Sequence, residues 1–273
     1  MHELTTLLLK AKDDVYSHLR GSNFSKILGQ GYDFSELRTY ESSDDVRHIS
    51  WINSAKLGEP YVKKMHEERE FLVHVSMIVD GRTIIGKKHN LMTYILAILA
   101  YSAVATSNLF EISLTLGKEF KNFEATKDIE AVEILLNKFS SLEPLGLVLD
   151  YGKIQKRLLK VQEQRSLFFV VGDFLDEIDL AILAQKHELC VIIIRDRWEE
   201  NPMLDSDVEL VNPLSNSTIS KTLSRKALRH YKKKLKEHDE KLYAHFHEHR
   251  IKYVKVYDRE EAVQKLEQLF YSE

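Results

Sequence analysis

The sequence predicts an α/β protein with a mainly parallel sheet that is covered by helices on both faces. Three continuously apolar segments indicate buried strands, at residues 71–80, 166–173 and 189–196, and helical segments separate them. Strands that are apolar on both sides are typical of a parallel sheet with both faces covered. The composition agrees, because 44% of the 273 residues are hydrophobic and only four are prolines.

Residues 1–70 are expected to pack on this core as a helix and an irregular segment. Apolar side chains recur at three- and four-residue intervals over residues 3–20, which predicts an amphipathic helix. Residues 21–60 keep neither a helical nor a strand period, so we assign no regular element there. This irregular segment includes the stretch ESSDDVRHISWINSAK at residues 41–56.

Residues 71–200 are expected to form the core itself. Residues 91–110 carry no formal charge and are long enough to cross a bilayer, but they contain several polar side chains and lack aromatic and basic anchors. We therefore predict a buried helix there. A hairpin around Gly117 is expected to follow, and helices are expected at residues 129–139, 151–162 and 176–187.

Residues 201–273 predict an extension that returns to the sheet. The segments DVELV and STIS favour an edge hairpin, and a long charged helix is expected from about residue 221 to 249. The end of the sequence, IKYVKVYD followed by REEAVQKLEQLF, predicts one more strand and a closing helix. A strand so late in the chain favours one sheet that includes it.

The net charge limits the kinds of partner that we expect, and the cysteine content indicates the redox state of the compartment. The formal net charge is −3, so no overall basic excess indicates nucleic acid or an anionic membrane as the obligatory partner. The sequence contains one cysteine, Cys190, which lies in an apolar run. A single cysteine excludes an intramolecular disulfide and favours a reducing compartment. The first residues do not resemble a signal peptide. We expect a cytoplasmic protein.

Two aspartates are placed where open parallel sheets bind ligands. Asp80 ends the first core strand and Asp173 ends the second. Ligands of such sheets bind beyond the carboxyl ends of the strands, near the point where the strand order reverses. The surface around Asp80, Arg82, Thr83 and Asp173 is therefore the first candidate for a recognition site.

A strand that ends in Asp-x-Ser-x-Ser, with a later strand that ends in aspartate, resembles the metal-dependent adhesion site of von Willebrand factor A domains. That resemblance implies a hard cation such as Mg²⁺ at an intact site. Here Arg82 and Ile84 stand at the two serine positions, and Val148 or Leu149 stands near the expected threonine. We predict a degenerate site without a cofactor, in which the Arg82 guanidinium replaces the cation and neutralises Asp80 or Asp173. The alternative is that Arg82 points into solvent.

The irregular segment and its flanks resemble the signature of a bacterial family numbered fifty-eight in the domain-of-unknown-function series. The resemblance continues near Asp173, Asp196 and Tyr231, and Ser43 and Ser50 depart from the family pattern. It implies a von Willebrand A-like core and a role as adaptor or substrate-handling partner of MoxR-type AAA+ ATPases. The matching residues are Gly29, Gly31, Phe34, Leu37, Arg38, Tyr40, Asp44, Asp45, Arg47, Ile49, Trp51, Ser54, Ala55 and Glu68.

The segment itself has a structural and a functional interpretation. Asp44, Asp45 and Arg47 can satisfy loop amides and one another, with Trp51 as an apolar pin that holds the segment on the sheet. Alternatively, the same side chains form a docking epitope, for which exposed arginine and tryptophan are favourable anchors.

Two other motifs are weak. Gly29 and Gly31 lack the preceding strand and the further residues that a nucleotide site requires. His245 and His249 lie one helical turn apart, but no third metal ligand is placed, so a solvated helix end is expected.

The sequence thus predicts a non-catalytic protein-interaction module that works with a MoxR-type AAA+ ATPase. One alternative is a metal-dependent hydrolase that uses Asp80 and Asp173. Another is nucleic-acid binding through the basic face of residues 221–241, although acidic neighbours favour a solvated helix there.

Overall fold

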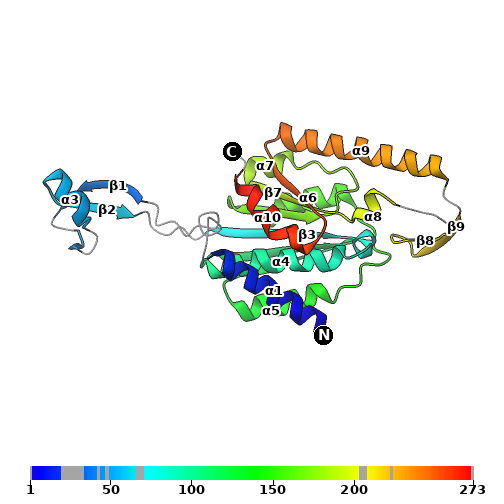
Figure 1. The fold of residues 1–273 in the computed structure, drawn as a ribbon, viewed down its shortest axis with the longest axis horizontal. Helices are drawn as coiled ribbons and strands as arrows, with labels where there is room; N and C mark the ends of the chain where they lie inside the picture. The colour runs from blue at the N-terminus through cyan, green and yellow to red at the C-terminus, as the bar shows by residue number, and fades with distance from the viewer. Residues whose placement is uncertain are drawn as a thin grey trace.

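The computed structural model contains the predicted α/β core, with one six-stranded sheet between two layers of helices (Figure 1). The core strands are β3 (Leu72–Val79), β4 (Leu109–Leu116), β5 (Glu119–Thr126), β6 (Leu167–Gly172), β7 (Glu188–Ile194) and β10 (Lys252–Val256). The residues that the structure describes are 2–19, 34–41, 44–46, 49–65, 71–202, 208–221 and 224–271.

The strand order across the sheet is β10-β7-β6-β3-β4-β5. All neighbours are parallel except β4 and β5, which form the predicted antiparallel hairpin. The chain fills the sheet outward from β3 in one direction and then from β6 in the other. The strand order therefore reverses between β3 and β6, which is where doubly wound sheets open a crevice at their carboxyl ends.

Each face of the sheet has its own hydrophobic core. Side chains from four helices pack on one face, and side chains from three others pack on the opposite face. The helices of the first face are α1 (His2–Leu19), α4 (Lys88–Ala105), α5 (Ile129–Ser140) and α10 (Arg259–Tyr271), and those of the second are α6 (Tyr151–Val161), α7 (Ala181–Lys186) and α9 (Arg225–Glu248).

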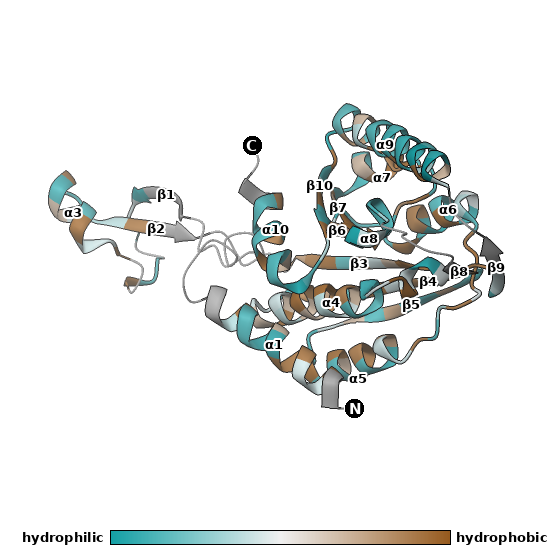
Figure 2. Cartoon of the chain, turned by 45° about the vertical axis from the view of Figure 1, so that its right-hand side comes forward, coloured by the Kyte–Doolittle hydropathy of each residue, from teal (hydrophilic) through white to brown (hydrophobic). Residues whose placement is uncertain are grey.

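The uncharged segment forms the buried helix α4, as predicted, although the helix begins three residues earlier, at Lys88, and ends at Ala105, so that the last two residues of the segment belong to β4. It lies between the sheet and the pair α1 and α5, so it has no solvent face to fill with charges. No helix in the described part of the chain is long and apolar enough to cross a membrane. Figure 2 shows the contrasting outer helix α9, which is largely hydrophilic.

The prediction of a helix over residues 176–187 is wrong in its first half, because α7 begins only at Ala181. The preceding loop is held in place by side chains of α9. The Phe174 carbonyl lies 2.8 Å from His238 Nε2, and the Leu180 amide donates to His245 Nε2 at 3.1 Å. These tertiary hydrogen bonds replace the helical ones that the local sequence favours.

The irregular N-terminal segment contains short elements that the sequence did not reveal. β1 (Phe34–Thr39) pairs antiparallel with β2 (Tyr61–Met65), and α3 (Trp51–Leu57) connects to β2. Both views show this unit apart from the sheet, beyond the amino end of β3 (Figures 1 and 2). Trp51 is 70% exposed, so its expected role as a pin on the sheet is wrong.

The predicted edge hairpin exists but does not join the core sheet. β8 (Val208–Asn212) and β9 (Ser217–Lys221) form a separate two-stranded sheet. It follows the short helix α8 (Arg197–Glu200), and Figure 1 shows it beside the carboxyl end of β3. β9 ends at Lys221, the residue at which the long helix was expected to begin, and α9 begins at Arg225.

Candidate functional site

The candidate site lies where β3 and β6 end side by side. Asp80 follows β3 and Asp173 follows β6, and both carboxylates are buried. Asp80 Oδ1 accepts a hydrogen bond from the Arg82 amide at 2.8 Å, which starts a short 3-10 turn over Gly81–Ile84. The Thr83 hydroxyl fixes this turn by donating to the Asp80 carbonyl at 2.7 Å. The turn therefore directs the Arg82 side chain back over the strand ends.

The Arg82 guanidinium lies among three carboxylates. Its Nη2 is 2.6 Å from Asp80 Oδ2 and 2.7 Å from Asp176 Oδ2, and its Nε is 3.5 Å from Asp173 Oδ2. Nη2 also donates to the Tyr151 hydroxyl at 3.3 Å. The side chain is only 13% exposed, so the alternative in which it points into solvent is wrong.

A second buried cation was missed by the sequence analysis. Lys88 Nζ lies 2.9 Å from Glu199 Oε2 and 3.6 Å from Asp173 Oδ2, and its side chain is 1% exposed. The only sequence signal was a lysine at the start of an otherwise uncharged helix, which is an ordinary place for a solvated charge. Asp173 therefore lies between Arg82 and Lys88.

Burial dominates the electrostatics of this cluster. It raises the pKa of Asp80 above its ordinary value, and Asp173 adds to this, although hydrogen bonds from Arg82 act in the opposite direction. Burial also raises the pKa of Glu199 despite the adjacent Lys88. For Arg82, burial acts to lower the pKa, but Asp173 and Asp80 outweigh it and raise the pKa. Arg82 is thus a permanent cation.

The residues present do not fit the divalent cation that an intact adhesion site would hold. Arg82 and Ile84 offer no ligand oxygen at the serine positions, and Arg82 and Lys88 already bind the carboxylates. Within the described ranges, no three histidine, cysteine or carboxylate side chains converge to hold a metal ion.

A cavity of about 420 Å³ opens over Arg82. Glu199 and Lys234 also line it, and most of its other walls are apolar or aromatic. Arg82 Nη1 makes no hydrogen bond or ion pair with any residue that the structure describes. The remaining lining residues are Ile85, Leu175, Asn212, Pro213, Leu214, Tyr231 and Leu235.

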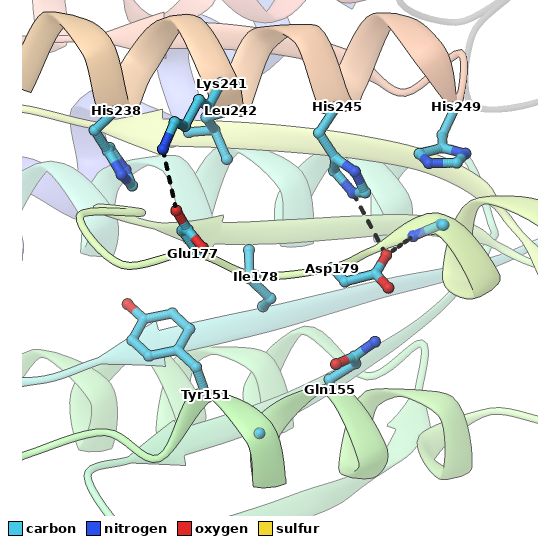
Figure 3. A pocket seen from close by; sticks show the side chains of 12 residues that line it. Tyr151, Gln155, Glu177, Ile178, Asp179, His238, Lys241, Leu242, His245 and His249 are labelled. Atoms are coloured by element: carbon cyan, nitrogen blue, oxygen red, sulfur yellow. Dashed lines mark hydrogen bonds and ion pairs between the residues drawn. The ribbon is translucent and has the colours of Figure 1, made fainter.

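A larger groove of about 730 Å³ lies beneath α9, between this helix and α6 (Figure 3). His245 faces Asp179 at 3.6 Å, and its Nε2 accepts the Leu180 amide, so its lone pair there is occupied. Burial and the neighbouring His249 lower the pKa of His245. His245 therefore anchors the loop before α7, so the expectation of a solvated helix end is wrong for this residue.

The described residues between Asp44 and Trp51 do not join the strand-end site. They belong to the unit beyond the amino end of β3, whereas Asp80 follows the carboxyl end of that strand (Figure 1). Asp44 accepts from the Glu41 amide at 2.9 Å and pairs with Arg38, as the structural interpretation expects of a loop carboxylate. Asp45 is exposed, and Arg47 lies outside the described residues.

The sheet also contains a buried chain of three polar side chains that the sequence analysis did not detect. His74 Nδ1 lies 2.8 Å from Glu111 Oε2, and His74 Nε2 lies 2.9 Å from Ser113 Oγ. The order serine, histidine, carboxylate is that of a nucleophilic triad. His74 and Ser113 are both fully buried, so a substrate cannot reach the hydroxyl in this structure.

The fold and the site define a doubly wound α/β protein with a crevice at the strand-order reversal that is filled by paired charges. The chain belongs to the family described as protein of unknown function DUF58, whose model matches residues 36–241. This family membership agrees with the signature in the N-terminal segment.

Relatives of this chain include uncharacterized proteins of Mycobacterium bovis and Mycobacterium tuberculosis. Each is 25% identical over 203 residues, which cover 71% of this chain and 64% of the relative. The chain thus spans less than two thirds of the length of these relatives.

Two solved structures are similar at lower identity. The conserved hypothetical protein BatB from Bacteroides thetaiotaomicron is 12% identical, with a TM-score of 0.44 over 74% of this chain and 100% of that one. An aerotolerance-related membrane protein from Bacteroides fragilis is 10% identical, with a TM-score of 0.42 over 73% of this chain and 98% of that one.

Proposed function

We propose that this chain is a non-catalytic protein-interaction module that recognises a partner carboxylate in the cavity over Arg82. The observation that carries the proposal is the state of the Arg82 guanidinium. Asp80, Asp173 and Asp176 contact its Nε and Nη2, while Nη1 is not engaged by any described residue and the side chain lines the cavity.

A guanidinium held in this way is suited to binding rather than to proton transfer. Its orientation is fixed before a partner arrives, so less side-chain entropy is lost on binding. The exposed Lys234 adds a second cation at the rim, and the apolar walls favour a segment that carries an apolar side chain beside its acidic one. Such an acidic and apolar segment is the partner chemistry that we propose.

The proposed partner class is a MoxR-type AAA+ ATPase, and the proposed compartment is the cytoplasm. Support for this partner comes from the family resemblance, and the compartment rests on the single buried cysteine. The geometry of the cavity indicates which chemical groups a partner would present, but it does not indicate which protein the partner is.

The proposal is tested by affinity capture from native cytosol, with and without ATP and Mg²⁺. Lys234→Glu reverses the charge at the cavity rim and leaves the buried pairs intact. Lys233→Glu is the matched control, because Lys233 is the adjacent residue of α9, is 75% exposed and pairs with Glu237 away from the cavity. We expect an AAA+ ATPase with the wild-type and Lys233→Glu proteins and its loss with Lys234→Glu. Equal capture by all three would refute a contact at this cavity.

The two alternatives make separate predictions. A metal-dependent hydrolase would show turnover that requires a divalent cation, yet Asp80 and Asp173 already contact Arg82. Nucleic-acid binding through α9 would weaken steeply with salt. Lys233 and Lys236 pair with Glu237 and Glu240, which reduces the free positive charge on that face.

A further inference from the structure

We infer that the turn of the β8–β9 hairpin, residues 212–216, is an intramolecular cap that narrows access to the cavity over Arg82 and whose release strengthens partner binding. The inference rests on the proposed function, because it describes how access to the same site is regulated. It is independent of which protein the partner is.

The turn is seated against the two loops that surround the strand ends. The Pro213 carbonyl accepts a hydrogen bond from the Gly146 amide at 2.8 Å. It also approaches Gly81 so closely that a Cβ on Gly81 would lie 1.9 Å from the Pro213 oxygen. Only glycine permits this approach, and Gly81 is the residue between Asp80 and Arg82. The backbone of the turn therefore contacts the element that positions the guanidinium.

The same turn forms one wall of the cavity. Asn212, Pro213 and Leu214 line it together with Arg82. The strands behind the turn pair with each other and with no other strand that the structure describes. Val211 is 53% exposed, and residues 215–218 are exposed as well. The seated part of the hairpin is thus its turn, which forms one wall of the proposed site.

A seated turn lowers the apparent affinity for a partner. If a partner segment binds Arg82 fully only when the turn has left Gly146 and Gly81, the apparent dissociation constant is raised by the inverse of the open fraction. Removal of the turn should therefore strengthen partner binding and expose Arg82 to small reagents.

The first test needs no partner. In the first variant, called the shortened variant, residues 210–219 are replaced by Asn-Gly and the rest of the chain is kept. The Asn-Gly pair forms a two-residue turn that joins the paired positions Glu209 and Ser220. In a second variant, Gly81→Ala, the added Cβ pushes the Pro213 carbonyl away. The readout is modification of Arg82 by phenylglyoxal, followed by peptide mass spectrometry. Arg197, whose side chain is 67% exposed, is the internal reference.

We expect Arg82 to react about tenfold faster in both variants relative to Arg197, as for a site opened by release of a local contact. Hydrogen exchange at the Gly146 amide reports whether the turn has left its seat. Unchanged Arg82 reactivity, together with accelerated Gly146 exchange, overturns the cap.

Affinity capture then separates this inference from the proposed function. Stronger capture of the ATPase by the shortened variant supports both. If Arg82 is modified faster in the variants but no variant captures an ATPase, the turn is a cap over Arg82 and the proposed partner is wrong. Weaker capture by the shortened variant makes the turn part of the partner contact and overturns the cap.

Discussion

Lys88 Nζ lies within 3.1 Å of both carboxylate oxygens of Glu199, although the two residues are 111 positions apart in the sequence. Both side chains are buried, and Asp173 stands 3.6 Å from the same nitrogen. The pair ties the start of α4 to α8 beneath the strand-end site. Removal of one member would leave a buried charge without its partner, which costs far more than loss of a surface pair.

Lys88→Met should therefore destabilise the protein by about 3–5 kcal/mol at pH 7. The measurement is the free energy of unfolding in urea. Lys138→Met, at an exposed position of α5, is the control and should stay within about 0.5 kcal/mol of wild type. The double variant Lys88→Met, Glu199→Gln should recover part of the loss. A single variant as stable as the control would show that the ion pair is not formed.

We expect the ionised Glu111 carboxylate to stabilise the folded protein and this stabilisation to be lost in acid. Burial acts to raise its pKa, but hydrogen bonds from His74, Asn122 and Gln162 outweigh burial and hold the pKa below its ordinary value of 4.5. Because the folded pKa is lower than the unfolded one, the stabilisation is fully present above the unfolded pKa. It is lost as the pH falls through the folded pKa.

The comparison is the free energy of unfolding from pH 7 to pH 3 for wild type and Glu111→Gln. The difference between them should be constant above about pH 5 and should shrink below that. Glu124→Gln, at an exposed position of β5, should keep the wild-type acid dependence. A difference that grows in acid would contradict the sign of the Glu111 pKa shift.

Cys190 should be inert toward thiol reagents in the native protein. It is fully buried in β7, and burial raises its pKa to about 12. Both effects suppress the reactive thiolate at pH 8, so modification should require unfolding. The rate with Ellman's reagent should follow the unfolded fraction in urea, whereas an added cysteine at the exposed position Ser217 should react at once. Rapid reaction of Cys190 without urea would argue against its placement.

Trp51→Ala should leave the stability of the core unchanged, within about 0.5 kcal/mol, because the side chain is 70% exposed. The measurement is the thermal unfolding midpoint, with Leu96→Ala in the buried helix α4 as the contrasting variant. Loss of a buried leucine should cost about 2–5 kcal/mol. A comparable loss with Trp51→Ala would restore the role of Trp51 as an apolar pin.

The strands β3, β6 and β7 were predictable because each is a largely apolar run that is followed by a polar residue. The same pattern placed Asp80 and Asp173 at one edge of the sheet. Arg82 stands where the adhesion-site motif has a serine, which indicated an ion pair between Arg82 and these aspartates, and the structure contains that pair. These are local signals, since the strand, its end and the next few residues lie together in sequence.

Lys88, Asp176 and the β8–β9 turn were not predictable in the same way. Lys88 pairs with a residue of α8, and Asp176 reaches Arg82 from a loop for which a helix was expected. Pro213 contacts Gly81 although the two residues are 132 positions apart, and the periodicity of the sequence gives no signal for a contact over such a distance. In each case the determining contact is tertiary, and the residues alone are typical of solvated surface.

The burial of α4 has a consequence for how the chain folds. This helix, which carries no lysine, arginine or carboxylate after Lys88, is covered by α1 and α5, and it also contacts α10, which follows the last strand of the sheet. During synthesis the helix is made long before residues 252–271 are available to complete its surroundings. Until then, part of an almost entirely apolar helix stays exposed, so the nascent chain should depend on a chaperone at that stage. Truncation before β10 should yield an aggregating product and not a smaller folded domain.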